Sequence, residues 1–150
     1  MPDDPRSQLL ADHALLRARL VAIAELARAV RMGESDDLGA LRAAAGDLLA
    51  ELRRHLAREE RLLDDALATG AGDEDRAVRE RLAREHAEQE LLLDHIVADV
   101  ADARRPPRLL GEKLQDFVGC LLEDMALEER TLLARLGPPS ARRSDSATSA

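Results

Sequence analysis

The chain has 150 residues, the size of a single domain, and 45% of them are hydrophobic although only 1% are aromatic. Charged residues make up 35% of the chain. This composition, rich in Ala and Leu, is typical of a helical bundle rather than a sheet protein. The formal net charge of −8 argues against nucleic acid as a partner, because phosphate binding needs a basic surface.

The compartment follows from cysteine usage and from the first residues. The single cysteine, Cys120, excludes an intramolecular disulfide and fits a reducing interior. The first eight residues, MPDDPRSQ, are acidic and polar, so we expect no signal peptide. No apolar run approaches the roughly 20 residues that a membrane span needs. We therefore expect a cytoplasmic protein that does not contact membranes.

Four segments carry apolar residues at helical spacing between capping and helix-ending residues. The expected helices run from Pro5, with Asp3 or Asp4 as cap, to about Met32, from the caps at 35–37 to near Gly70, from about Asp73 to Ala103, and from the prolines at 106–107 to Gly137. Residues 138–150 are rich in Ser, Arg, Ala and Thr, so we expect a disordered tail. The fold prediction is an all-α, up-down-up-down antiparallel four-helix bundle over residues 1–137.

The apolar row of the second expected helix is interrupted by two polar residues. The row is Leu41, Ala45, Leu48 and Leu52. Its next two positions are His55 and Glu59. Burying an imidazole and a carboxylate costs several kcal/mol unless other groups pair with them. Matching polar residues are therefore expected on the other helices.

An internal repeat supplies those residues. HLAREERLL at 55–63 aligns with DMALEERTL at 124–132, an offset of 69 residues. ADHA at 11–14 aligns with REHA at 84–87, an offset of 73 residues. The chain therefore consists of two copies of one helical hairpin.

The polar residues are expected at one height, because residues equidistant from a turn are level in an antiparallel pair. The midpoint of residues 13 and 55 is 34, that of 86 and 124 is 105, and that of 59 and 86 falls between 72 and 73; all lie in expected loops. The predicted buried polar layer contains His13, His55, Glu59, His86, Glu90, Asp124 and Glu128.

Three imidazoles and four carboxylates in a bundle core are a set of metal ligands. Seven ligands exceed what one ion usually takes from side chains, so the count favours two ions bridged by carboxylates. Iron suits imidazole and carboxylate best, with manganese or zinc as alternatives. A metal-free hydrogen-bond network is the competing interpretation, and its excess buried negative charge makes it costly.

The order of these residues resembles that of the hemerythrin-like cation-binding family: one His on the first helix, then His55-x3-Glu59, His86-x3-Glu90 and Asp124-x3-Glu128. The match covers residues 5 to about 137. The resemblance implies a non-haem di-iron centre at these positions, with the two irons bridged by carboxylates or by an oxo or hydroxo group. Glu59 and Glu128 would be the bridging carboxylates.

Two positions depart from the family pattern, because Glu90 and Asp124 stand where the family commonly has His. Anionic oxygen ligands stabilise ferric over ferrous iron, which disfavours reversible O2 carriage. We expect binding or redox processing of O2, peroxide or nitric oxide, including peroxidase-like, catalase-like or nitric-oxide-processing activity. The alternative is a metal-dependent iron or oxygen sensor, or a partner-binding module, without turnover.

Three further residues near the expected ligands were assigned to the periphery. Arg17 is expected to be a solvated arginine, although a role at the rim, paired with a carboxylate, is the alternative. Glu60 and Glu129 each follow a ligand and point about 100° away, which suits surface positions or positions behind the ligands.

Overall fold

The computed structural model describes residues 4–67, 72–102 and 104–135. These residues form four helices and no strand: α1 (Pro5–Arg31), α2 (Leu38–Leu67), α3 (Asp73–Ala101) and α4 (Pro107–Arg135). The four-helix bundle is confirmed. The helix ends expected near Gly70, at Ala103 and at Gly137 lie outside the described residues. The expected tail, residues 138–150, lies outside the described residues.

The helix ends are set by the capping residues that the sequence contains. Asp4 accepts hydrogen bonds from the backbone N–H groups of Arg6 and Ser7, at 3.0 and 3.2 Å. Asp37 accepts one from Ala40 at 2.9 Å, just after the start of α2. Gly33 follows α1 with φ +73°, a left-handed conformation that favours glycine and ends the helix.

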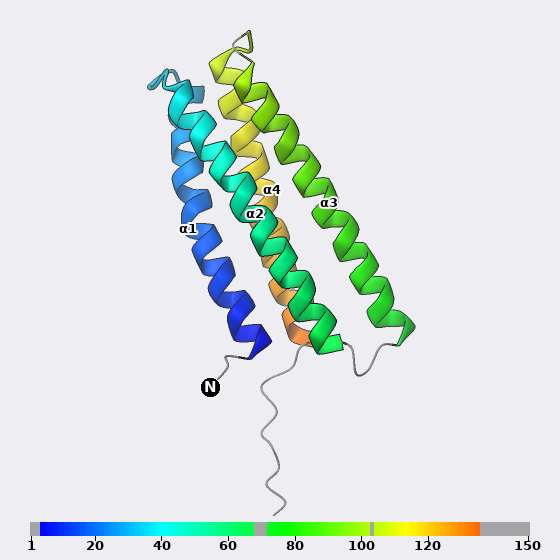
Figure 1. Ribbon diagram of the computed structural model, residues 1–150. Helices are drawn as coiled ribbons and strands as arrows, with labels where there is room; N and C mark the ends of the chain where they lie inside the picture. The colour runs from blue at the N-terminus through cyan, green and yellow to red at the C-terminus, as the bar shows by residue number, and fades with distance from the viewer. Residues whose placement is uncertain (1–3, 68–71, 103, 136–150) are drawn as a thin grey trace, which may run out of the picture.

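Figure 1 shows the four helices running alongside one another, with the α1–α2 and α3–α4 turns at the same end of the bundle. Helix α1 packs against α4 and α2, and α3 packs against α2 and α4, as an up-down-up-down bundle requires. The contact between α1 and α4 is especially close. A Cβ atom added to Gly111 would lie 2.5 Å from the backbone oxygen of Ala27.

The core consists of two apolar clusters of unequal size. The larger one fills the half of the bundle nearer the two turns and includes Leu20, Leu52, Leu93 and Phe117. The smaller one contains Leu63 and Leu82, with Val78 packed against it. Along α2 and α3, the polar residues of the expected layer lie between the two clusters. The buried polar groups of α2 and α3 therefore have apolar side chains on both sides of them along the bundle.

One helix presents a different face from the expected one. The buried positions of α3 alternate steps of four and three: Leu82, His86, Gln89, Leu93, Ile96 and Val100. The predicted buried layer includes Glu90 on this helix, but Glu90 is only half-buried. Four-residue steps drift around an α-helix, whereas alternating steps keep the row facing the bundle axis. Gln89, not Glu90, therefore occupies the buried position.

None of the helices in the described ranges is long and apolar enough to cross a membrane.

Candidate metal centre

Five of the seven expected residues meet inside the bundle as buried side chains. His13 and Glu59 are each 1% exposed, and the other three are also buried: His55, His86 and Glu128. The four helices supply them, because α1 carries His13, α2 carries His55 and Glu59, α3 carries His86 and α4 carries Glu128. The expected convergence of polar residues from both hairpins is therefore present.

The five residues form two groups of three, and Glu59 belongs to both. One group is His13, His55 and Glu59, and the other is Glu59, His86 and Glu128. Within each group the potential ligand atoms lie within 4.8 Å of one another. Nε2 of His55 and Nε2 of His86 are each 3.5 Å from Oε2 of Glu59. A carboxylate common to two groups of ligands is the arrangement expected of a bridging residue.

The layer contains buried polar atoms that no protein group satisfies. Both oxygens of Glu59, Nε2 of His13, Nδ1 of His55 and both ring nitrogens of His86 are buried without a hydrogen-bond partner. Each such atom costs about 1–3 kcal/mol. Metal ions bound by Nε2 of His13, Nε2 of His86 and the Glu59 oxygens would remove the part of that cost that falls on these atoms. The residues thus fit a metal centre of nitrogen and oxygen donors.

The protonation states are shaped by the same burial. Burial, with the nearby Glu128 carboxyl, raises the pKa of Glu59 to about 8. Burial and the neighbouring His13 ring, whose centroid lies 5.0 Å away, lower the pKa of His55 to about 4. Near neutral pH the metal-free centre therefore holds a protonated Glu59 and a neutral His55, and a metal ion bound by Glu59 would displace its proton.

The remaining histidine of the centre shifts the other way. Burial by itself lowers the pKa of His86, but the carboxyl groups of Glu128, Glu59 and Glu60 outweigh it and the net shift is upward. Nε2 of His86 lies 3.7 Å from Glu128 and 3.5 Å from Glu59. The metal-free centre is thus a place where carboxyl groups and His86 share protons.

The other two expected ligands, Glu90 and Asp124, belong to neither group. Glu90 is half-buried and lies beside the buried face of α3. Asp124 is also half-buried, and its Oδ2 accepts a hydrogen bond from Nε2 of Gln89 at 2.9 Å. Sequence reasoning missed Gln89, although the alternating four-and-three steps along α3 could have indicated it. A direct metal-binding role for Glu90 and Asp124 stays a prediction.

A second missed contact lies behind His13. Nδ1 of His13 is 2.9 Å from Oε1 of Glu129, and the same oxygen is 2.7 Å from the guanidinium of Arg17. The hydrogen bond from Arg17 holds the pKa of Glu129 below its ordinary value. Of the two expectations for Arg17, the solvated arginine is wrong and the alternative, pairing with a carboxylate, is confirmed: its guanidinium pairs with the carboxylate that contacts a buried histidine.

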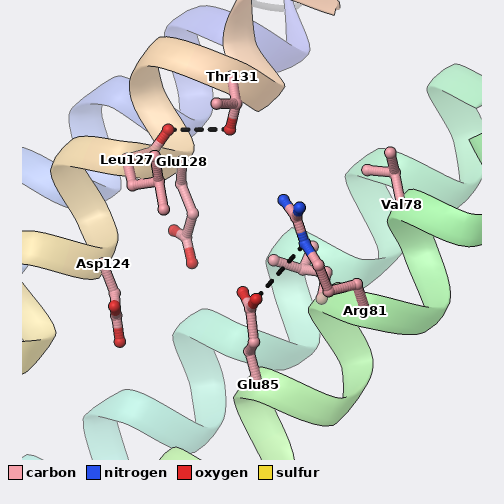
Figure 2. A pocket seen from close by; sticks show the side chains of 8 residues that line it. Val78, Arg81, Glu85, Asp124, Leu127, Glu128 and Thr131 are labelled. Carbon is pink, nitrogen blue, oxygen red and sulfur yellow. Dashed lines mark hydrogen bonds and ion pairs between the residues drawn. The ribbon is translucent and has the colours of Figure 1, made fainter.

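A pocket between α3 and α4 leads toward the centre. It has a volume of about 250 Å³, and Glu128 and Asp124 lie on its α4 side. Figure 2 shows Glu128 pointing from α4 toward Arg81 and Glu85 on α3, which form an ion pair of 3.4 Å. The pocket is large enough for several water molecules or a small ligand. It gives one of the candidate ligands access from the surface.

Comparison with known families agrees with this geometry. The family model of the hemerythrin HHE cation-binding domain matches residues 4–136. The chain belongs to this hemerythrin family. No curated protein and no solved structure matches the chain. The match spans all four helices, so the domain as a whole, and not only the histidine-bearing segments, is hemerythrin-like.

The hemerythrin domain of this chain therefore carries His and Glu groups that could hold a metal ion, in a bundle of the type the family uses for cations. The fourth histidine, His95, is exposed on α3 and is not part of either group. The candidate centre is confined to the layer around Glu59.

Proposed function

We propose that this hemerythrin-like chain is a non-haem di-iron protein that binds or redox-processes O2, peroxide or nitric oxide in its bundle core. The observation that carries the proposal is the sharing of Glu59 between two groups of buried ligands. One group would hold one ion and the other group the second, with Glu59 between them. The proposed location of the protein is the cytoplasm.

The donor set supports iron over the alternatives. Three imidazoles with carboxylates are borderline-to-hard ligands, which suit iron, while manganese and zinc are the competing ions. Asp124 and Glu90 stand where the family commonly has histidine. Asp124 lines the pocket beside Glu128, and its negative charge there would favour ferric iron, and thus redox processing over reversible O2 carriage.

Iron bound here would supply one-electron redox chemistry and coordination positions for a small ligand. The residues of the chain would control proton release, water access and ligand access around the iron. Glu59, with its raised pKa, can release a proton when metal binds and take one up when metal leaves. The leucines of both clusters exclude bulk water. The pocket beside Glu128 is wide enough for a diatomic ligand or peroxide.

Anaerobic reconstitution with Fe²⁺ tests the proposal, followed by separate additions of O2, peroxide and nitric oxide under optical observation. The chain has no Tyr and no Trp, so absorbance near 280 nm and above comes almost wholly from the metal centre. We expect two irons per chain and a new absorption band with at least one of the three additions. Metal analysis well below one iron per chain would exclude the proposed centre.

The same experiment separates the main proposal from the sensor alternative. A sensor or partner-binding module would bind iron and change its spectrum without consuming peroxide or nitric oxide over repeated additions. Its metal-loaded and metal-free forms would differ in association, measured by light scattering. Sustained consumption of either compound by the iron-loaded protein, absent from a His55→Ala control, would support redox processing.

A further inference from the structure

The two hairpins each place a glutamate behind a candidate ligand histidine of the other hairpin. Glu129 of α4 lies 2.9 Å from Nδ1 of His13 on α1. Glu60 of α2 lies 3.5 Å from Nδ1 of His86 on α3. The repeat relates these contacts, because Glu60 aligns with Glu129 and His13 aligns with His86. A glutamate behind a histidine of the other hairpin is therefore a feature that both copies of the hairpin share.

The two contacts differ in strength. The distance at His13 is that of a charge-assisted hydrogen bond, whereas 3.5 Å at His86 is too long for a good one. The Glu129 side chain is 23% exposed and that of Glu60 is 50% exposed. The contact at His13 is thus shorter and better shielded from water.

The difference has a cause in the sequence. Arg17 lies one turn after His13, and its guanidinium is 2.7 Å from the Glu129 oxygen that contacts His13. The residue that aligns with Arg17 in the second hairpin is Glu90. A carboxylate cannot hold Glu60 in place, and among the described residues no arginine pairs with Glu60. One histidine therefore has an anchored carboxylate behind it, and the other does not.

We propose, on the basis of the proposed metal-binding function, that Arg17 and Glu129 are positioning residues for His13. Arg17 holds the Glu129 carboxylate in place through an ion pair of 2.7 Å. An ionised carboxylate only accepts hydrogen bonds, so Nδ1 of His13 must carry the proton. The lone pair of Nε2 then faces the centre, where Nε2 is buried without a hydrogen-bond partner. Carboxylates behind ligand histidines fix the tautomer and orient the ring in this way.

The first test uses metal-free, full-length protein and needs no bound metal. The chain has four histidines, so nitrogen chemical shifts can report the tautomer of each. At about pH 8 we expect His13 to carry its proton on Nδ1, the nitrogen that faces Glu129. Glu129→Ala should convert His13 to a mixture of tautomers. An unchanged His13 tautomer in this variant would overturn the proposal.

The second test measures Co²⁺ binding by absorbance titration. Glu129→Ala should lower the affinity for one ion by roughly 10–100-fold, as for other residues behind metal-bound histidines. Arg17→Ala should have a smaller effect in the same direction, and Arg17→Lys, which keeps the cation, should restore most of the affinity. If Glu129→Ala does not fold, as judged by circular dichroism, Glu129→Gln and Arg17→Ala replace it in both tests.

Two control variants separate positioning from helix pairing. Arg19→Ala removes another arginine–glutamate contact of α1, the 2.9 Å pair with Glu51, without touching a ligand. Glu60→Ala removes the aligned but looser contact. Both should change the Co²⁺ affinity by no more than about threefold, as expected of exposed charge pairs. An equal loss in Arg19→Ala and Glu129→Ala would mean that only helix pairing was lost, and would overturn the proposal.

The two tests also distinguish this inference from the proposed function. If the wild-type protein shows the expected His13 tautomer but binds no Co²⁺, the hydrogen-bond arrangement is supported and the proposed metal centre is contradicted. If the wild-type protein binds two ions, and Glu129→Ala changes neither the His13 tautomer nor the affinity, the metal centre is supported and the positioning role is contradicted.

Discussion

His55 of α2 and His86 of α3 each place Nε2 3.5 Å from the same atom, Oε2 of Glu59. Neither nitrogen forms a good hydrogen bond at that distance, and both oxygens of Glu59 are buried without a partner. In a purely structural core, buried polar groups are almost always hydrogen-bonded, so three such groups without good hydrogen bonds around one atom would be unusual. This relationship makes Glu59 the residue on which both groups of ligands depend.

Glu59→Gln should therefore separate metal binding from stability. The amide has nearly the shape of the carboxyl group but no charge to share between two ions. We expect the number of bound Fe²⁺ ions to fall below two per chain, with affinity lowered at least about 100-fold, as measured by metal analysis and titration. Because the variant never ionises at this buried position, the metal-free protein should be at least as stable as wild type at pH 8 in urea unfolding. Glu60→Gln, on the neighbouring exposed residue, is the control that should retain both ions.

The stability of the metal-free protein should pass through a maximum in mildly acidic solution. The pKa of Glu59 is raised from 4.5 to about 8, so the folded state holds a proton that the unfolded chain has lost, and stability falls as the pH rises between these values. The raised pKa of His86 acts in the same direction. The pKa of His55 is lowered from 6.5 to about 4, so stability also falls as the pH drops through that range.

Urea unfolding between pH 4 and pH 9 measures this profile. Above pH 6.5, Glu59→Gln should flatten the decline because the titrating carboxyl group is gone. A metal-free wild-type protein whose stability rises steadily from pH 6.5 to pH 8 would contradict the raised pKa of Glu59.

Glu90 and Asp124 should differ in their effect on the centre. Asp124 lines the pocket beside Glu128 and is held by Gln89, whereas Glu90 is outside both the pocket and the two ligand groups. We expect Asp124→Ala to weaken binding of one ion by about 10-fold, the size expected of a residue next to the ligands. Glu90→Ala should leave titration curves close to wild type. A larger loss in Glu90→Ala would show that Glu90 reaches the metal when it is bound.

The bundle and most of the candidate centre could be predicted from the sequence, because both depend on the spacing of residues along each helix and on their distance from the turns. His13, His55, Glu59 and His86 could be placed at one height from the loop midpoints, and Glu128 from its position one helical turn after Asp124. A helix turns by about 100° per residue, so this argument fixes height well but fixes the facing direction only to within one residue. That limit explains why Glu90 was chosen on α3 when Gln89 faces the core.

The sequence left the pairing of Arg17 with a carboxylate as an alternative and did not identify Glu129 as the partner, for a different reason. Arginine has many rotamers, and whether it extends into solvent or reaches a carboxylate on another helix depends on the packing of both helices. The repeat did hold one indication, because Glu129 aligns with Glu60 behind a second histidine. Only the distances show which of the two contacts is tight.

Metal addition should stabilise the folded protein, and His55→Ala, which disrupts one of the two ligand groups, should reduce that effect. A ligand at 100 times its Kd adds about 2.7 kcal/mol, which for a chain of this size raises the Tm by several degrees. Calorimetry with and without Fe²⁺, under anaerobic conditions, measures the shift, and a chelator should reverse it. An equal Tm increase in wild type and His55→Ala would place the bound metal outside the proposed centre.

Gly111 should be required for the close packing of α1 against α4. A Cβ atom at this position would lie 2.5 Å from the backbone oxygen of Ala27 and 2.9 Å from the backbone nitrogen of Arg31. Backbone atoms cannot move aside as a flexible side chain can, so Gly111→Ala must push the helices apart. We expect a loss of about 1–3 kcal/mol in the free energy of unfolding, measured in urea.

Gly119 on the same helix is the matched control for that substitution. It is exposed, and an added Cβ atom would meet no neighbouring atom within 4 Å. Gly119→Ala should therefore stabilise α4 by about 0.5–1 kcal/mol, because alanine loses less backbone entropy than glycine in a helix. Opposite signs for the two variants would establish that helix contact, and not helix propensity, decides the effect at Gly111. Equal stabilisation of both would show that α1 and α4 are farther apart than the structure has them.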